Sequence, residues 1–178
     1  QTVYHAACAG HTENPSNVWK WEIPAPEYLK GVKDKYCKGN KHQNWTKDVE
    51  ISYLVKKMNA GGYKQIKDIV SIKFIDRTKS GRAKNVKIKY EHENGKSRVI
   101  TISAGAFRMM VSPWILKSTY VSDVQKIKKG AFRFSGHGWG HGVGLCQWGA
   151  KVMADKGFGY KEILKFYYPG TKLEKWED

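Results

Sequence analysis

A glycine-rich segment at residues 136–150 constrains this chain more than any other part of its sequence. It contains six glycines, two histidines, two tryptophans, one cysteine and one glutamine within fifteen residues. Glycine costs chain entropy and adds no side chain to a core, so this density favours backbone that adopts positive φ or approaches another group closely. One interpretation is a glycine turn beside a buried histidine. The polar and aromatic residues between the glycines favour the other interpretation, a binding site.

The flanking patterns predict a strand before this segment and a helix after it. Residues 131–135 are rich in β-forming side chains, and apolar residues recur with helical spacing over 145–155. A turn between a strand and a helix directs backbone N–H groups toward a ligand. The segment has neither the ending of a phosphate loop nor a nucleophile elbow, so we expect it to bind a neutral polar ligand such as a sugar. The candidate substrate-binding residues are Ser135, His137, Trp139, His141, Gln147 and Trp148.

The rest of the chain alternates between strand-like and helix-like patterns. Residues 86–90 alternate apolar and polar side chains, and the Asn-Gly pair at 94–95 predicts a tight hairpin into a return strand over 98–102. Further strands are expected at 3–7, 45–51, 66–75, 118–121, 131–135 and after Pro169-Gly170, and short helices after Ser52, after Ser103, and over 145–155 and 160–167. We therefore predict an α+β fold with mostly antiparallel strands and short helices packed around them, as a single domain over residues 1–178.

The chain is strongly basic, with 32 Lys and Arg residues against 16 Asp and Glu residues and a formal net charge of +16. Such a charge attracts polyanions, including nucleic acid, anionic lipid and acidic cell-wall polymer, without selecting among them. The lysines are spread along the chain, and no motif that reads bases accompanies them. The pattern favours a solvated basic surface, and we predict no nucleic-acid partner.

The first residues, Gln1-Thr2-Val3-Tyr4-His5, lack the charged and apolar regions of a signal peptide and read as the middle of a strand. No apolar run approaches the roughly 18 residues that a membrane-spanning helix needs. We therefore expect the chain to be a fragment whose natural beginning is missing.

Two Cys-His pairs indicate a metal site. Cys8 and His11 form a Cys-x2-His pattern, and Cys37 and His42 form a Cys-x4-His pattern. Thiolate and imidazole ligands at such spacings suit tetrahedral zinc, and the predicted metal ligands are Cys8, His11 and Cys37. His5 lies close enough in sequence to contribute as well. The zinc is expected to be structural, because a site filled by protein ligands leaves no position for a reactive water.

Other arrangements of the cysteines are compatible with the same pattern. Three cysteines are an odd number, so at least one is unpaired or metal-bound. Cys8 and Cys37 could instead form a disulfide, or all the thiols could be buried and unlinked. A second metal site that uses His137, His141 and Cys146 is a further alternative.

A long stretch of the chain resembles a known family. Residues 134–150 are similar to the signature of the SpoIID/LytB family, and residues 4–13 (Tyr-His-Ala-Ala-Cys-Ala-Gly-His-Thr-Glu) resemble its Tyr-His-(small)-Gly-x-Thr-Glu stretch. Residues 107–108 (Phe-Arg) and 117–119 (Lys-Ser-Thr) match two shorter elements of that family. The resemblance continues through the Pro-Gly pair at 169–170 and covers nearly the whole chain.

The resemblance implies a peptidoglycan lytic transglycosylase, which cuts glycan strands that have lost their stem peptides while the forespore is engulfed. A single Glu is expected to protonate the glycosidic oxygen and then, as a base, to help the muramic acid 6-hydroxyl close a 1,6-anhydro ring. The implied partners are an amidase/endopeptidase and a membrane protein. The implied location is extracytoplasmic and membrane-anchored, between the mother-cell and forespore membranes.

The chain departs from this family at the catalytic acid. The family's Glu belongs to an N-terminal Ser-Glu-Met-type helix, and no such motif is present here; Glu13 lies nearest to a matched motif but is not expected to be the acid. The resemblance thus implies that this chain supplies most of the substrate cleft, whereas a missing upstream segment carries the acid and the membrane anchor. The alternatives are a non-catalytic wall-binding enhancer of an amidase, as the LytB branch suggests, and a polyanion-binding module.

Overall fold

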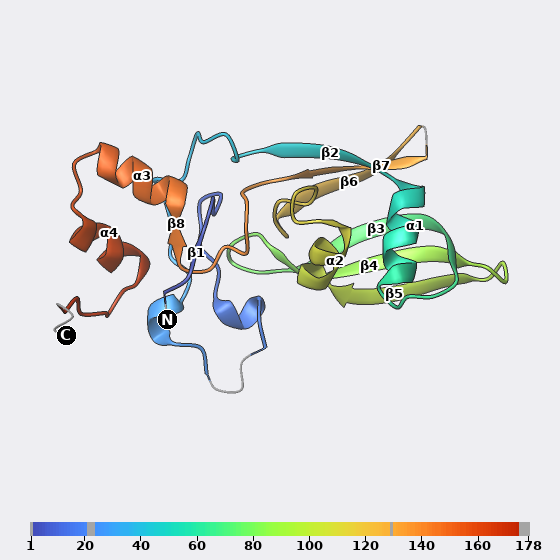
Figure 1. The fold of residues 1–178 in the computed structure, drawn as a ribbon, viewed down its shortest axis with the longest axis horizontal. Helices are drawn as coiled ribbons and strands as arrows, with labels where there is room; N and C mark the ends of the chain where they lie inside the picture. The colour runs from blue at the N-terminus through green and yellow to red at the C-terminus, as the bar shows by residue number, and fades with distance from the viewer. Residues whose placement is uncertain (1, 21–23, 129, 175–178) are drawn as a thin grey trace. The chain divides into compact units, whose positions relative to one another are not determined.

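The computed structural model describes residues 2–20, 24–128 and 130–174 (Figure 1). Its short helices and mostly antiparallel strands confirm the predicted α+β class. The chain forms two compact units: residues 44–138 make up one, called the central unit here, and residues 1–43 with 139–178 make up the other, called the terminal unit. Among the described helices, none has the length and apolar composition required to cross a lipid bilayer.

The central unit contains two three-stranded antiparallel sheets, in the orders β2-β7-β6 and β3-β4-β5. Their strands are β2 (Trp45–Glu50), β3 (Ile66–Arg77), β4 (Ala83–His92), β5 (Ser97–Ser103), β6 (Val121–Ile127) and β7 (Ala131–Gly136). The alternation predicted for residues 86–90 is observed: Val86, Ile88 and Tyr90 are buried, and the lysines between them are exposed. Because strand side chains alternate between faces, one face of β3-β4-β5 belongs to the core and the other is open.

Two helices cover the core face of the β3-β4-β5 sheet, α1 (Ile51–Ala60) and α2 (Ala104–Val111) (Figure 1). Leu54 of α1 and Phe107 of α2 are completely buried in this core. Ser103 caps α2 as expected, since its side chain accepts a hydrogen bond from the amide of Ala106. The expected cap of α1 is wrong: the helix already begins at Ile51, so Ser52 lies inside it.

The terminal unit brings the two ends of the chain together around a smaller core. β1 (Tyr4–His5) pairs in parallel with β8 (Leu145–Cys146). The remaining elements are two short 3₁₀ helices, η1 (Pro15–Asn17) and η2 (Glu27–Leu29), and the helices α3 (Gln147–Asp155) and α4 (Tyr160–Tyr167). Leu29, Met153 and Tyr167 are buried in this core together with the three cysteines.

Several element boundaries differ from the sequence expectation. The strand expected at 3–7 is reduced to β1, and the helix expected from 145 begins at 147 because β8 pairs with β1. The strand expected at 118–121 is found at 121–127. The Ser118 hydroxyl donates a hydrogen bond to the carbonyl of His137 and accepts one from the amide of Tyr120, so Ser118 is part of a turn before the strand. No strand follows Pro169-Gly170 over 171–174, and the rest of that expectation lies outside the described residues.

Candidate functional site

Four buried side chains converge in the terminal unit: Cys8, Asp34, Cys37 and Cys146. One ligand atom of each, a sulfur or a carboxylate oxygen, lies within 4.8 Å of the corresponding atoms of the other three. All four residues have 0% exposed surface. Three sulfurs and one carboxylate at this separation form a group that could hold a metal ion, and we call it the thiol cluster.

Local backbone structure aims each of these side chains at the same point. Asp34 lies in the loop after η2, where its Oδ1 accepts hydrogen bonds from the amides of Tyr36 (2.9 Å) and Cys37 (3.1 Å). Such a turn ties an aspartate to the backbone that follows it. Cys146 occupies the N-cap of α3, where its sulfur accepts from the amide of Gly149 at 3.4 Å. The cluster therefore joins a loop, the start of a helix and the segment after β1.

Hydrogen bonds link the three thiols into one coupled system. The Cys8 sulfur donates to Asp34 Oδ2 at 3.2 Å, and the Cys146 sulfur donates to the Cys37 sulfur at 3.2 Å. The hydrogen bond from Cys146 lowers the pKa of Cys37 below the usual range of a thiol. The bonds that Cys8 makes with Cys146 and Cys37, together with burial, raise the pKa of Cys8.

An outer layer of contacts supports the carboxylate of Asp34. The hydroxyl of Tyr167, on α4, donates to Asp34 Oδ2 at 2.8 Å, and burial raises the pKa of this hydroxyl so that it stays protonated as a donor. Gly149 on α3 lies so close that a Cβ there would collide with the Tyr167 hydroxyl and the Asp34 carboxylate. Glycine at 149 is thus required by the close approach of α3 to the cluster.

The cluster includes two of the three ligands expected from sequence, Cys8 and Cys37. His11 is not part of it, because its Nδ1 lies 2.6 Å from the carbonyl of Thr12. His5 is also outside the cluster, with its Nδ1 3.0 Å from the carbonyl of Val143. All three cysteines are free thiols, so Cys8 and Cys37 are not joined by a disulfide.

Sequence reasoning missed the fourth member of the cluster and left the role of the third cysteine open. Asp34 stands three residues before Cys37, a spacing that could have indicated a shared turn. The sequence gives Cys146 a metal-binding role only in an alternative site with His137 and His141, neither of which belongs to the thiol cluster. The odd number of cysteines was the sequence signal for Cys146, because a third buried thiol is expected to contact other polar groups within the fold.

The glycine-rich segment runs from β7 of the central unit to β8 of the terminal unit. Gly138, Gly140, Gly142 and Gly144 have φ values of 71°, 104°, 90° and 72°, which confirms the expected positive-φ backbone. At Gly144 a side chain is excluded for a second reason, since a Cβ would collide with the carbonyl of Val3. The alternating glycines are therefore a requirement of the local backbone path.

Backbone hydrogen bonds join this segment to residues 3–13. Trp139 and Ala7 exchange bonds of 2.9 and 3.0 Å, and the amide of Glu13 donates to the carbonyl of Gly142 at 2.8 Å. The amide of Leu145 donates to the carbonyl of Val3 at 3.0 Å. The two stretches that carry the family resemblance are thus joined into one structure. The backbone N–H and C=O groups named here form hydrogen bonds within that structure.

Two of the candidate substrate-binding residues, Trp139 and Trp148, share a neighbour in the terminal unit. The ring of His42 meets both edge-on, with centroid distances of 4.7 Å to Trp139 and 6.1 Å to Trp148. The ammonium group of Lys41 lies 5.8 Å from the centre of the Trp148 ring. Both tryptophans are half-buried, so they combine a fixed position with accessible ring surface.

The other candidate residues divide between the two units. In the terminal unit, the His141 ring packs 4.9 Å from that of Trp19, and Gln147 is exposed at the start of α3. In the central unit, His137 Nδ1 lies 2.8 Å from Asn44 Oδ1, and the hydroxyl of Ser135 lies 3.5 Å from that of Thr46.

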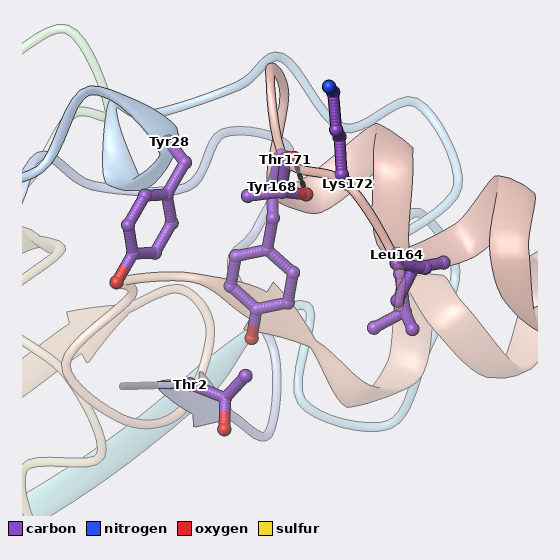
Figure 2. A pocket seen from close by; sticks show the side chains of 7 residues that line it. Thr2, Tyr28, Leu164, Tyr168, Thr171 and Lys172 are labelled. Atoms are coloured by element: carbon purple, nitrogen blue, oxygen red, sulfur yellow. Dashed lines mark hydrogen bonds between the residues drawn. The ribbon is translucent and has the colours of Figure 1, made fainter. Parts of the chain in front are cut away.

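A pocket of about 240 Å³ opens elsewhere in the terminal unit (Figure 2). Tyr28 and Tyr168 face it with their rings 6.3 Å apart, and Leu164 of α4 contributes an apolar side chain. Its other lining residues are Thr2, Thr171, Lys172 and Leu173. No member of the thiol cluster and no candidate substrate-binding residue lines this pocket.

Comparison with known protein sequences places this chain in a family. The profile of a domain family described as a domain of unknown function (DUF8618) matches residues 26–144. An uncharacterized protein of Brachyspira hyodysenteriae is 36% identical over 173 residues, which are 97% of this chain and 42% of that protein. The amidase enhancer of Bacillus subtilis is 29% identical over 210 residues, covering 98% of this chain and 30% of that protein.

The stage II sporulation protein D of Bacillus subtilis is 29% identical over 176 residues, which cover 98% of this chain and 45% of that protein. This chain therefore spans less than half the length of each of these relatives. The chain belongs to the DUF8618 domain family and is a member of the SpoIID-like group of proteins.

Proposed function

We propose that this chain is the glycan-binding part of a SpoIID-like lytic transglycosylase, which cleaves peptidoglycan strands and leaves 1,6-anhydromuramic ends. The observation that carries the proposal is the pairing of the glycine-rich segment with residues 3–13, through the hydrogen bonds of Ala7 and Glu13 to Trp139 and Gly142. Both stretches resemble the same family. Because they hydrogen-bond to each other in the fold, it is expected that one sequence carries both. A relative named stage II sporulation protein D, matched over 98% of this chain, supports the assignment.

In this proposal the chain binds and orients the sugar. Trp139 and Trp148 offer apolar ring faces, and the exposed amide of Gln147 and the imidazole of His141 offer hydrogen bonds. Aromatic platforms with a few polar groups are a usual composition for ligand sites. Ser135 and His137, which belong to the central unit, stay predicted substrate-binding residues on the basis of the sequence.

The catalytic carboxyl is proposed to come from outside this chain. Glu13 is 3% exposed, and its Oε1 accepts hydrogen bonds from the amide of Asn14 (2.8 Å) and the side chain of Asn17 (2.9 Å). These bonds stabilise the local turn, which supports a structural role for this Glu. One external acid is sufficient, because the 6-hydroxyl of muramic acid is itself the nucleophile and a second carboxylate is not needed.

The proposed setting extends what the resemblance to the SpoIID/LytB family implies, and the relative named stage II sporulation protein D supports it. The protein acts outside the cytoplasm, anchored in the membrane through a segment that is not part of this chain, between the mother-cell and forespore membranes. Its proposed partners are an amidase/endopeptidase and a membrane protein of the engulfment machinery. A second candidate function is enhancement of an amidase without glycan cleavage, which is favoured by the relative named amidase enhancer, matched over 98% of this chain.

Product analysis separates the two functions. Glycan strands without stem peptides are incubated with this chain, or with a longer protein that includes the upstream segment, and anhydro-muropeptides are measured. We expect anhydro ends only with the longer protein. Stimulation of an amidase without any anhydro ends would favour the enhancer function, and anhydro ends from this chain alone would place the acid among its own residues.

We also propose that the thiol cluster holds a structural Zn²⁺ ion. Zn–S bonds of about 2.3 Å in a tetrahedral site place ligand atoms about 3.8 Å apart. The separations in the cluster, all within 4.8 Å, fit that size. Three thiolates favour zinc over Mg²⁺ or Ca²⁺, and four protein ligands leave no position for water, so the ion is assigned a structural role.

A further inference from the structure

The open face of the β3-β4-β5 sheet carries lysines in adjacent positions. Helices α1 and α2 cover the opposite face (Figure 1), so Lys87 and Lys89 of β4 project away from the core, and both are exposed. Lys73 of β3 is the cross-strand neighbour of Lys87 and is exposed as well. Three positive charges therefore lie in neighbouring positions on one face of the sheet.

Folding alone does not account for this arrangement. Like charges directly opposite each other in an antiparallel pair are destabilising, and Lys73 faces Lys87 in that way. Within the described parts of the chain, no ion pair involves Lys73, Lys87 or Lys89. Bound anions would convert this repulsion into attraction.

The acidic residues around this face already have partners. Glu91 and Asp68 lie at one end of the sheet, and each forms an ion pair with a lysine, at 2.9 and 3.8 Å. Asp76 lies toward the other end and accepts a hydrogen bond of 2.8 Å from an asparagine. Those partners are Lys67 for Glu91, Lys126 for Asp68 and Asn85 for Asp76. The centre of the face therefore remains positive.

The other side chains of the open face narrow the class of anion. Ser71 lies opposite Lys89, and Thr101 lies opposite Lys87, so hydroxyl donors accompany the lysines. The open-face positions hold no aromatic residue; they are 71, 73, 75, 85, 87, 89, 91, 97, 99, 101 and 103. Recognition of single-stranded nucleic acid relies on aromatic stacking, and insertion into a lipid interface relies on large apolar side chains. The apolar side chains among these positions are Ile75 and Val99, two aliphatic residues set between lysines and hydroxyls, so a hydrophilic polyanion fits this face better than either of those occupants.

A groove extends this face along its edge. It has a volume of about 350 Å³ and lies between β3 and β6, where Lys73, Ile75 and Ser122 contribute to its lining. Asp123 also lines it and accepts a hydrogen bond of 2.7 Å from Gln125. The groove is large enough for the uncharged part of a polymer repeat while Lys73 contacts its charged group.

We propose that this surface, formed by Lys73, Lys87 and Lys89 with Ser71 and Thr101 and called the lysine face, binds a linear polymer of phosphodiester-linked polyol units. Residues two apart on a strand are separated by roughly 6.8 Å and adjacent strands by about 4.8 Å, which are spacings from which three flexible lysine side chains can reach successive phosphates of one chain. Such polymers accompany peptidoglycan in many cell walls. The choice of polymer rests on the proposed cell-wall setting, whereas the surface itself lies on the sheet of the central unit and its binding can be tested without glycan cleavage.

The test measures binding of fluorescent poly(glycerol phosphate) by anisotropy over a range of salt concentrations. One variant carries Lys73→Gln, Lys87→Gln and Lys89→Gln. The matched control carries Lys47→Gln, Lys56→Gln and Lys64→Gln, which removes the same charge from exposed positions of the same unit. We expect the lysine-face variant to bind about tenfold more weakly with a shallower salt dependence, and the control to stay near the original affinity.

Three results would overturn the proposal. Equal losses in both variants would mean that net charge alone drives binding. Tighter, lysine-face-dependent binding to phosphatidylglycerol vesicles than to the polymer would assign the face to a membrane, and the same preference for single-stranded DNA would assign it to nucleic acid. Thermal unfolding provides a check on folding: removing the Lys73–Lys87 repulsion should leave the melting temperature unchanged or higher, so lost binding cannot be ascribed to unfolding.

Discussion

At the scale of single residues, Asp34 connects separate segments of the terminal unit. Its carboxylate accepts bonds from two backbone amides, the Cys8 thiol and the Tyr167 hydroxyl, and so connects three parts of the terminal unit. These hydrogen bonds offset part of the cost of completely burying a carboxylate next to thiols, but they supply no opposite charge. A bound divalent cation would supply one.

Substitution of the cluster residues tests the ligand set. Asp34→Asn keeps the shape of the side chain but removes its charge, and Cys37→Ala removes the central thiol. We expect both variants to lose bound zinc after purification, measured by elemental analysis. His11→Ala is the matched control and should retain it, because His11 lies outside the cluster. Zinc loss in His11→Ala with retention in Cys37→Ala would restore the ligand set expected from sequence.

At the scale of elements, local signals and pairing partners determine the structure together. Ser103 caps α2 through a bond to the amide of Ala106, as its sequence context indicates. Ser52 has the same side chain and also precedes an apolar helical pattern, but α1 starts before it, directly after β2 ends at Glu50. The start of α1 follows directly from the end of the paired strand β2, and the pattern of neighbouring residues does not reveal that pairing.

The two serines provide a matched pair of variants. Ser103→Ala should lower the free energy of unfolding by about 0.5–2 kcal/mol, since an amide at the start of α2 loses its acceptor. Ser52→Ala should change it by less than about 0.5 kcal/mol, because that serine is not a cap. Urea unfolding followed by circular dichroism measures both. A larger effect at Ser52 than at Ser103 would contradict the observed helix boundaries.

At the scale of the whole molecule, the chain builds one unit from its middle and one from its two ends. The terminal unit depends on contacts between residues far apart in sequence, including Cys8 with Cys146 (3.3 Å from amide to sulfur). Closing such long loops has a high entropic cost. A metal ion at the thiol cluster would offset this cost by holding Cys8, Cys37 and Cys146 in place.

Metal removal should therefore affect the two units differently. Chelation at neutral pH is expected to abolish slow hydrogen exchange in β1, β8 and α3 while β3, β4 and β5 retain protection, because structural zinc contributes folding free energy only where it binds. Hydrogen exchange resolved by mass spectrometry after proteolysis measures this difference, with re-addition of Zn²⁺ as the control. Unchanged protection in the terminal unit would mean that its hydrophobic core is sufficient without a metal.

Much of the fold class and part of the site were predictable from local pattern. The alternation at 86–90, the hairpin at 94–95 and the dense glycines at 136–144 each reflect constraints that act within a few residues. By contrast, β6 contains polar residues at most positions, so its pairing with β7 rather than its own periodicity establishes it as a strand. Edge strands carry weak patterns because only part of one face is buried.

The sequence by itself determined the α+β class, the positive-φ glycine segment and the resemblance to SpoIID-like proteins. Only the tertiary structure decided that Asp34 and Cys146, and not His11, join Cys8 and Cys37. It also decided that Lys73 lies opposite Lys87. The physical reason is the same in both cases: glycine conformation and strand alternation act over neighbouring residues, whereas a ligand set and a strand register depend on which distant segments the folded chain brings within a few ångströms.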